Sequence, residues 1–162
     1  MLATGLPDIS RRQWIKQLIA CCWYWHLLPT ENIITMEPKG ITIRSSPYSV
    51  KETIDRLVII LEKNKASVYA RIDQQAEVRN TGREMGALEF ILFGNPKAGG
   101  PIMLENPMAA LDLPLKIIAW EDASKKVWLA YNKAAYLQER YDLSPALTVP
   151  IDLDPLVAGI LA

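Results

Sequence analysis

Residues 115–132 read LKIIAWEDASKKVWLAYN and contain two apolar runs separated by a short polar segment. The runs at 115–122 and 126–132 have the length and the β-branched and aromatic content of strands, and Asp122-Ala123-Ser124 is typical of a hairpin connection. Strands joined by so short a turn run antiparallel. The stretch therefore predicts a sheet built at least partly from antiparallel strands.

The residues before this hairpin alternate between strand and helix patterns. Isoleucines alternate with polar residues in a predicted strand at 39–46. A helix follows, because Ser49 and Glu52 form a capping box and apolar residues then recur at helical spacing. Alternation returns at 67–73, and the nearly continuous apolar run at 87–94 predicts a central strand.

Helical patterns also flank the hairpin. Asn106 and Pro107 are a cap and first residue of a short helix, a second helix is predicted around 134–140, and the last apolar turns begin at Asp154. The order is strand, helix, strand, strand, helix, strand, strand, helix, helix. We therefore expect an α+β fold of two layers, with a mostly antiparallel sheet and helices packed on one face. This single domain should span residues 37–162.

The composition excludes one class of partner. The chain has 162 residues, of which 50% are hydrophobic and 22% are charged, and its formal net charge is zero. Binding to nucleic acid through the phosphate backbone normally requires a basic excess or a basic stripe. We therefore expect no nucleic-acid partner.

Residues 1–36 form an N-terminal extension for which three interpretations stay open: a docking helix, a disordered segment, or the product of an upstream start site. Its apolar block runs from Leu18 to Leu28 and is too short to span a bilayer, so no stable membrane insertion is expected. Cys21 and Cys22 are adjacent and have no other cysteine to pair with, which favours free thiols in the cytoplasm. A metal site with His26 would depart from the usual ligand spacing, so we expect no metal and no cofactor.

The stretch FGNPKAGGPIM at 93–103 has two interpretations. Its glycines and Lys97 could present backbone amides and a positive charge to an anion, although the spacing of a P-loop is absent. The favoured interpretation is a strand exit, in which Gly94 lets the chain turn, Asn95 bonds the local backbone and Pro96 fixes the direction.

Several separate blocks resemble one family. FGNPKAGGPIM, LDLPLKIIAWED (111–122), VWLAYNKAAYLQERY (127–141), RSSPYSVKETIDRL (44–57) and VYARID (68–73) together resemble the domain-of-unknown-function 302 family over about residues 38–141. The resemblance implies a small α+β domain that is often a homodimer, with no established enzymatic activity. Members commonly carry histidines where this chain has Gln74 and Tyr141, and a threonine where it has Gly100. Any family activity that depends on those side chains is therefore not expected here.

The candidate ligand-binding residues are Asn95, Lys97, Asp112, Asp73 and Glu105. The first hypothesis is an uncharacterised, non-catalytic homodimeric module that binds a small molecule or a partner in a cleft near Asn95–Lys97 and Asp112. The alternative is an enzyme of undefined acid/base chemistry that uses Asp73, Lys97 and Glu105, which requires these side chains to converge.

Two further groups of residues receive structural interpretations. Asp112 lies between two leucines before Pro114 and is expected to cap a helix exit or to hydrogen-bond the backbone there. Trp120, Trp128 and Tyr131 fall on the two strands of the hairpin and are expected in the core or in an interface.

Overall fold

The computed structural model describes residues 38–161, so the predictions for the N-terminal extension, including those for Cys21, Cys22 and His26, lie outside the described residues. Five strands form one sheet in the order β1-β5-β4-β3-β2, and every neighbouring pair is antiparallel. Their bounds are β1 (Ile41–Ser46), β2 (Ser67–Asp73), β3 (Leu88–Gly94), β4 (Leu115–Glu121) and β5 (Val127–Asn132). The predicted α+β class with an antiparallel sheet is confirmed.

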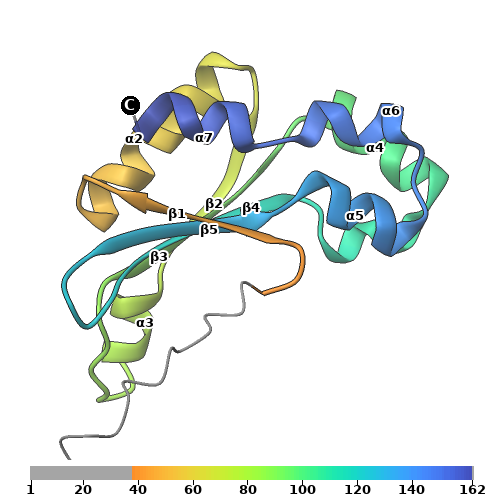
Figure 1. Ribbon diagram of the computed structural model, residues 1–162. Coiled ribbons are helices and arrows are strands. Elements are labelled where there is room, and N and C mark those ends of the chain that lie inside the picture. The colour runs from red at the N-terminus through yellow and green to blue at the C-terminus, as the bar shows by residue number, and fades with distance from the viewer. Residues whose placement is uncertain (1–37, 162) are drawn as a thin grey trace, which may run out of the picture. The chain divides into compact units, whose positions relative to one another are not determined.

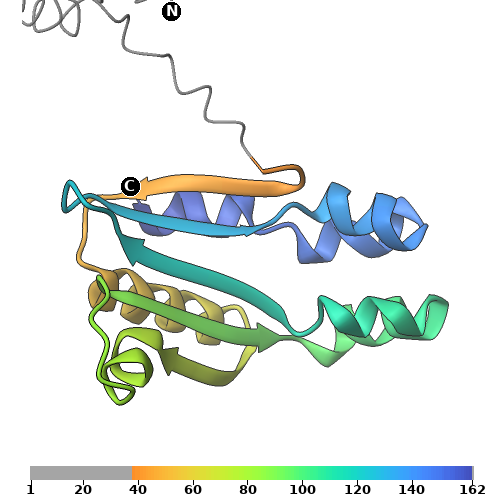
Figure 2. The ribbon, with the colours of Figure 1, turned by 90° about the horizontal axis from the view of Figure 1, so that it is seen from below.

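Two helices cover one face of this sheet. Figure 1 shows α2 (Val50–Lys63) and α7 (Asp154–Leu161) on the same side of the strands, and in Figure 2 the strands lie in front of both helices. The other helical segments lie toward the two ends of the strands (Figure 1). They are α3 (Gln74–Arg79), α4 (Pro96–Glu105), the 3-10 helix η2 (Pro107–Leu111), α5 (Ala134–Tyr141), α6 (Pro145–Thr148) and the 3-10 helix η3 (Val149–Ile151).

The sequence around α2 explains where this helix begins and which side it buries. The Ser49 side chain accepts a hydrogen bond of 3.2 Å from the backbone N–H of Glu52, as the capping box predicts. Ile54 and Leu57 are fully buried against the sheet. Thr53 is also buried, and its hydroxyl lies 2.7 Å from that of Ser46 on β1, so a hydrogen bond joins the helix to the edge strand.

The core lies between the central strands and the α2–α7 layer. Ile91, Ile117 and Leu129 come from three adjacent strands and are completely buried, with Val157 and Ile160 of α7 in the same cluster. Burial of such a side chain stabilises the fold by about 1.5–3 kcal/mol. The two layers are therefore held chiefly by aliphatic packing.

The opposite side of the sheet is also apolar, and we call it the open sheet face. The strand register gathers most of its apolar side chains in two rows: Ile43, Ala130, Ile118, Phe90 and Ile72 in one row, and Trp128, Trp120 and Leu88 in the next. Polar side chains also stand on this face, namely Ser45 beside Trp128, and Lys116 and Asn132 in the adjoining row. In Figure 2 no described helix crosses in front of β1, β5 and β4. Trp120 and Trp128 thus share this face, whereas Tyr131 points to the helical side, where its hydroxyl donates to Asp154.

The strand exit after β3 is not a loop but the helix α4. Asn95 accepts a hydrogen bond from the backbone N–H of Lys97, and Pro96 occupies the first turn, which is a standard helix start. The helix was not predicted because Gly99, Gly100 and Pro101 are poor helix formers. Short helices also occupy residues 145–151, between the helix predicted around 134–140 and the last apolar turns, and α3 follows β2 without a predicted signal.

Candidate functional site

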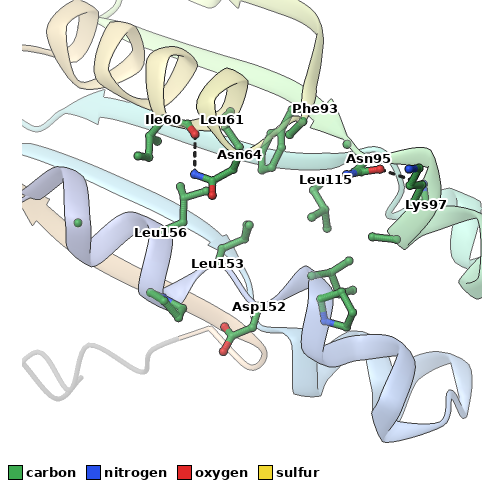
Figure 3. A pocket seen from close by; sticks show the side chains of 17 residues that line it. Ile60, Leu61, Asn64, Phe93, Asn95, Lys97, Leu115, Asp152, Leu153 and Leu156 are labelled. Carbon is green, nitrogen blue, oxygen red and sulfur yellow. Dashed lines mark hydrogen bonds between the residues drawn. The ribbon is translucent and has the colours of Figure 1, made fainter.

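A groove opens on the helical side of the sheet, at the end where α4 begins. Its volume is about 730 Å³, and it lies between the last turn of α2 and the segment that leads from η3 into α7 (Figure 3). Phe93 and Leu115, near the ends of β3 and β4, line it together with Ile60 and Leu61 of α2 and residues 150–156. The groove therefore brings together four parts of the chain that are far apart in the sequence.

Apolar side chains form most of this lining, and polar groups lie at its margin. In Figure 3 Leu153 and Leu156 point toward the groove from one side, and Asn64 points into it from the end of α2. The Asn64 amide nitrogen donates to the carbonyl oxygen of Ile60 over 2.8 Å, which fixes its orientation. The two charged residues of the lining are Lys97 and Asp152.

The beginning of α4 does not offer free backbone amides to an anion. Pro96 has no N–H, the Lys97 N–H donates to the Asn95 side chain, and the N–H groups of Ala98 and Gly99 both donate to the Asn95 carbonyl oxygen. Any attraction for an anion here must therefore come from the Lys97 side chain. The local backbone bonding predicted for Asn95 is confirmed.

A second, narrower cavity adjoins the groove. Its volume is about 190 Å³, and it shares five lining residues with the groove: Gly94, Asn95, Ala98, Leu115 and Ile151. Its own lining includes Tyr69, Gly99, Met103, Leu113 and Pro114. Tyr69 and Met103 are 55% and 40% exposed, so large apolar side chains face solvent beside this cavity.

Asp112 belongs to a separate polar cluster. Its carboxylate accepts hydrogen bonds from the Tyr141 hydroxyl at 2.5 Å and from the Asn132 amide at 3.3 Å, and it pairs with Arg140 at 3.1 Å. Burial raises the pKa of Tyr141, and the hydrogen bond to Asp112 raises it further. Asp112 is the C-cap residue of η2, as predicted for a helix exit, but its side chain bonds other side chains instead of the backbone and so ties η2 to α5 and β5.

The structure separates the three residues of the enzyme hypothesis. Asp73 accepts the backbone N–H of Ala76 and caps α3, and Glu105 accepts the backbone N–H of Ser144. Ser67, the first residue of β2, pairs with Gly94, which lies just before Lys97. Asp73 is at the other end of β2, about 20 Å along the strand, and is therefore far from Lys97. Of the predicted candidates, only Asn95 and Lys97 line the groove.

The positions of the two family histidines also lie apart. Gln74 is the first residue of α3 and follows the end of β2, which pairs with the start of β3. Tyr141 is the last residue of α5, and α5 follows the end of β5. In an antiparallel sheet of this order these are opposite ends of the strands. Histidines at these positions would therefore not meet in one site of a single chain.

Most of the residues that line the groove were not among the candidates. Asn64, Asp152, Leu153 and Leu156 come from a helix end and from the C-terminal segment, neither of which carries a recognised motif. Their only sequence signal is the apolar spacing of α7, which predicts burial and not a cavity.

The described part of the chain lacks two features, a metal-binding cluster and a membrane-spanning helix. No cluster of three or more His, Cys, Asp or Glu side chains in residues 38–161 is arranged to hold a metal ion. No helix in the same range has both the length and the apolar character to cross a membrane.

Comparison with known proteins gives one family and one fold. The model of the family described as "Domain of unknown function DUF302" matches residues 41–159. The chain resembles a crystal structure of an uncharacterized conserved DUF302 protein from Bacillus stearothermophilus, with a TM-score of 0.64 at 18% identity over 76% of this chain and 97% of that one. That likeness shows the fold alone.

The curated relatives are longer proteins. The chain is 37% identical over 120 residues to "Fluoride-specific ion channel FluC 1" of Brucella suis biovar 1 (strain 1330), and equally to "FluC 1" of Brucella abortus biovar 1 (strain 9-941). These alignments cover 74% of this chain and 46% and 44% of the relatives. The chain thus spans slightly less than half of their length.

Proposed function

The chain belongs to the DUF302 family, and from that premise we propose that it is a non-catalytic module that binds a small ligand in the groove and works as a homodimer. The groove carries the binding part of this proposal. Its volume of about 730 Å³ lies within the range of about 300–1,000 Å³ that is usual for ligand pockets. Its lining, apolar with a few polar groups at the margin, also matches such pockets.

The separation of the acid and base candidates favours binding over catalysis. An active site needs charged side chains that converge on one reacting atom. Asp73 and Glu105 instead satisfy backbone N–H groups at other helix ends, and Lys97 alone faces the groove. A cytoplasmic location, predicted from the two cysteines, remains part of the proposal.

A pair of neighbouring substitutions in α7 tests ligand binding. Gly159 lines the groove and a Cβ there would meet no atom within 4 Å, so Gly159→Leu narrows the groove without a clash at Cβ. Ala158 is exposed and lines no described cavity, so Ala158→Leu is the matched control. The full chain is screened by thermal shift against a panel of metabolites. We expect a compound that stabilises the wild type and Ala158→Leu but not Gly159→Leu; equal shifts in all three proteins would refute the groove as the site.

The open sheet face supports the homodimer. The three strands that no described helix crosses, β1, β5 and β4, lie about 4.8 Å apart with six or seven residues each at about 3.3 Å, which gives a footprint of roughly 300 Å² per copy. A stable interface buries about 800 Å² of accessible surface per partner, so neighbouring segments would have to contribute the rest. Two identical sheets also have the same twist, which allows them to pack face to face.

Light scattering tests this association directly. The wild type should give twice the chain mass of 18.2 kDa. Ile118→Lys, in the middle of the open sheet face, should give the mass of one chain, because it would bury an unpaired charge. Ile59→Lys is the control, since Ile59 is 66% exposed on α2. A monomeric wild type, or a dimer that Ile118→Lys leaves intact, would contradict this assignment.

A second candidate function comes from the names of the curated relatives. We propose, as the alternative, that the module serves beside a fluoride channel and responds to fluoride. Millimolar sodium fluoride should then raise the unfolding temperature above that in sodium chloride of equal ionic strength. If fluoride gives no such shift, the module does not sense fluoride directly.

A further inference from the structure

We infer that the ligand of the groove is an amphipathic anion, a molecule with one carboxylate-like group and a short apolar tail. The inference rests on the proposed binding function and adds the chemical class of the ligand. It follows from how the groove and the narrow cavity divide their polar and apolar groups.

The apolar part of the ligand fits the narrow cavity. Leu113, Pro114 and Met103 line this cavity, and Tyr69 lies beside it with more than half of its surface exposed. Exposed large apolar side chains next to an apolar cavity leave surface that an apolar ligand removes from water. Because the cavity and the groove share five lining residues, one short molecule can contact both.

The anionic part fits the margin of the groove at Lys97. Lys97 is the one cationic side chain of either lining, and within residues 38–161 it forms no ion pair. The side chains of Asn95, which lines both the cavity and the groove, and of Asn64 are the nearby polar amides, and both already bond the backbone. The site thus has a positive charge without a partner at one side of an apolar surface.

The other charged residue of the lining does not favour a cationic ligand. Asp152 accepts the backbone N–H of Asp154 at 3.1 Å, which orients its carboxylate at the start of α7 but leaves its negative charge in place. In Figure 3 its side chain points away from Asn64 and Leu156. Figure 3 places Lys97 and Asp152 on different sides of the groove, so the anionic group of the ligand is assigned to the side of Lys97.

The inference is tested by measuring how octanoate binds to the full chain. Titration calorimetry gives the affinity, and NMR shifts of the backbone amides give the place of binding. Octanoate should bind more tightly than octanol and octylammonium, and its shifts should include Asn95, Ala98 and Gly99. Lys97→Gln should weaken octanoate binding by about fivefold, as expected for an exposed ion pair, and leave octanol unchanged. Lys63→Gln is the control, because it removes the same charge outside both linings.

A substitution that fills the narrow cavity gives a second, independent test of the inference. A Cβ at Gly99 would meet only the Leu113 side chain at 3.9 Å, so Gly99→Leu extends into the cavity from an uncrowded position. It should weaken octanoate and octanol alike by tenfold or more, while Ala158→Leu changes neither. The unfolding temperature of each variant identifies any loss that is caused by misfolding.

The outcomes separate this inference from the proposed function. If a neutral or cationic compound binds and Gly159→Leu blocks it, while octanoate does not bind, the binding function stands and the anionic class is wrong. If octanoate binds but Lys97→Gln and Gly99→Leu have no effect, the inference is overturned. If no compound binds in the groove, both fail.

Discussion

Three glycines allow the cost of a backbone conformation to be separated from the cost of a steric clash. Gly40 and Gly82 have positive φ angles of 81° and 78°, but only Gly40 is crowded: a Cβ there would lie 2.2 Å from Cγ of Tyr136. At Gly82 a Cβ would meet nothing within 4 Å. Gly159, inside α7, has neither constraint. Each is changed to alanine.

The expected changes in the free energy of unfolding follow from these differences. Positive φ costs an alanine about 1–2 kcal/mol, partly offset by the lower entropy of the unfolded chain, so Gly82→Ala should destabilise by about 1 kcal/mol. Gly40→Ala adds the displacement of a packed ring, typically about 1–3 kcal/mol, for a total of about 2–4 kcal/mol. Gly159→Ala should stabilise by about 0.5–1 kcal/mol, because alanine favours a helix.

Urea unfolding, monitored by circular dichroism, measures the free energy of unfolding of the three alanine variants. A double variant, Gly40→Ala with Tyr136→Gly, identifies the clash, because the Cβ of Tyr136 would also lie only 2.8 Å from the new Cβ, and removing both the ring and this Cβ should reduce the cost of Gly40→Ala to that of Gly82→Ala. If Gly40→Ala costs no more than Gly82→Ala in the wild-type background, the packing of Tyr136 over the turn before β1 is wrong.

The remaining predictions concern polar groups that hold elements together. Hydrogen bonds from Ser124 and the indole N–H of Trp128 lower the pKa of Asp122 to about 2, from an ordinary value of 3.8. The stabilisation of the fold by ionised Asp122 is therefore complete above pH 3.8 and is lost as the pH falls through about 2. The NMR shift of the Trp128 indole proton should change with a midpoint at about pH 2, where Asp122 becomes protonated. Thr53→Val removes the buried hydrogen bond to Ser46 and should lower the free energy of unfolding by about 1–2 kcal/mol in urea. Asp112→Ala removes the acceptor of the Tyr141 hydroxyl and should destabilise the fold by about 1–3 kcal/mol by the same measurement.

Each of these predictions has its own control. Asp122→Asn should abolish the acid transition of the Trp128 proton, and a midpoint near pH 4 in the wild type would contradict the hydrogen bonding of the hairpin turn. Ser45→Ala, at an exposed position of β1, should change the free energy of unfolding by less than about 0.5 kcal/mol. Glu139→Ala, on the surface, is the control for Asp112→Ala. If both variants lower the free energy of unfolding by the same amount, the contacts of Asp112 do not stabilise the fold.

Much of the fold was predictable because its signals are local. The capping box at Ser49, the apolar spacing of α2 and the polar turn at Asp122 each depend on residues close together in the chain. The helix α4 was missed because Asn95 and Pro96 indicate a helix start while the glycines and Pro101 that follow favour a turn. Tertiary contacts of Ile102, which is buried, outweigh those weak propensities.

The site was less predictable than the fold because it depends on distant parts of the chain. Asn95 and Lys97 were recognised from their glycine-rich surroundings, but the opposite wall comes from residues 150–159, whose pattern indicates only burial. Asp112 was recognised as a candidate, yet its partners Arg140 and Tyr141 come from α5 and make it part of the scaffold. No spacing rule in a single sequence gives such pairings.

The strand order has a consequence for how the chain folds during synthesis. β1 is the first strand made, yet it pairs only with β5, the last, so Ile41 and its partner Asn132 are 91 residues apart (132 minus 41). Strands β2 to β5 form a meander in which each new strand can pair with its predecessor as it emerges. β1 can pair only after β5 has been synthesised. Such non-local pairing is slow, because the large loop between the two strands has to close first. The sheet therefore stays without one edge strand until the residues through Asn132 have been made.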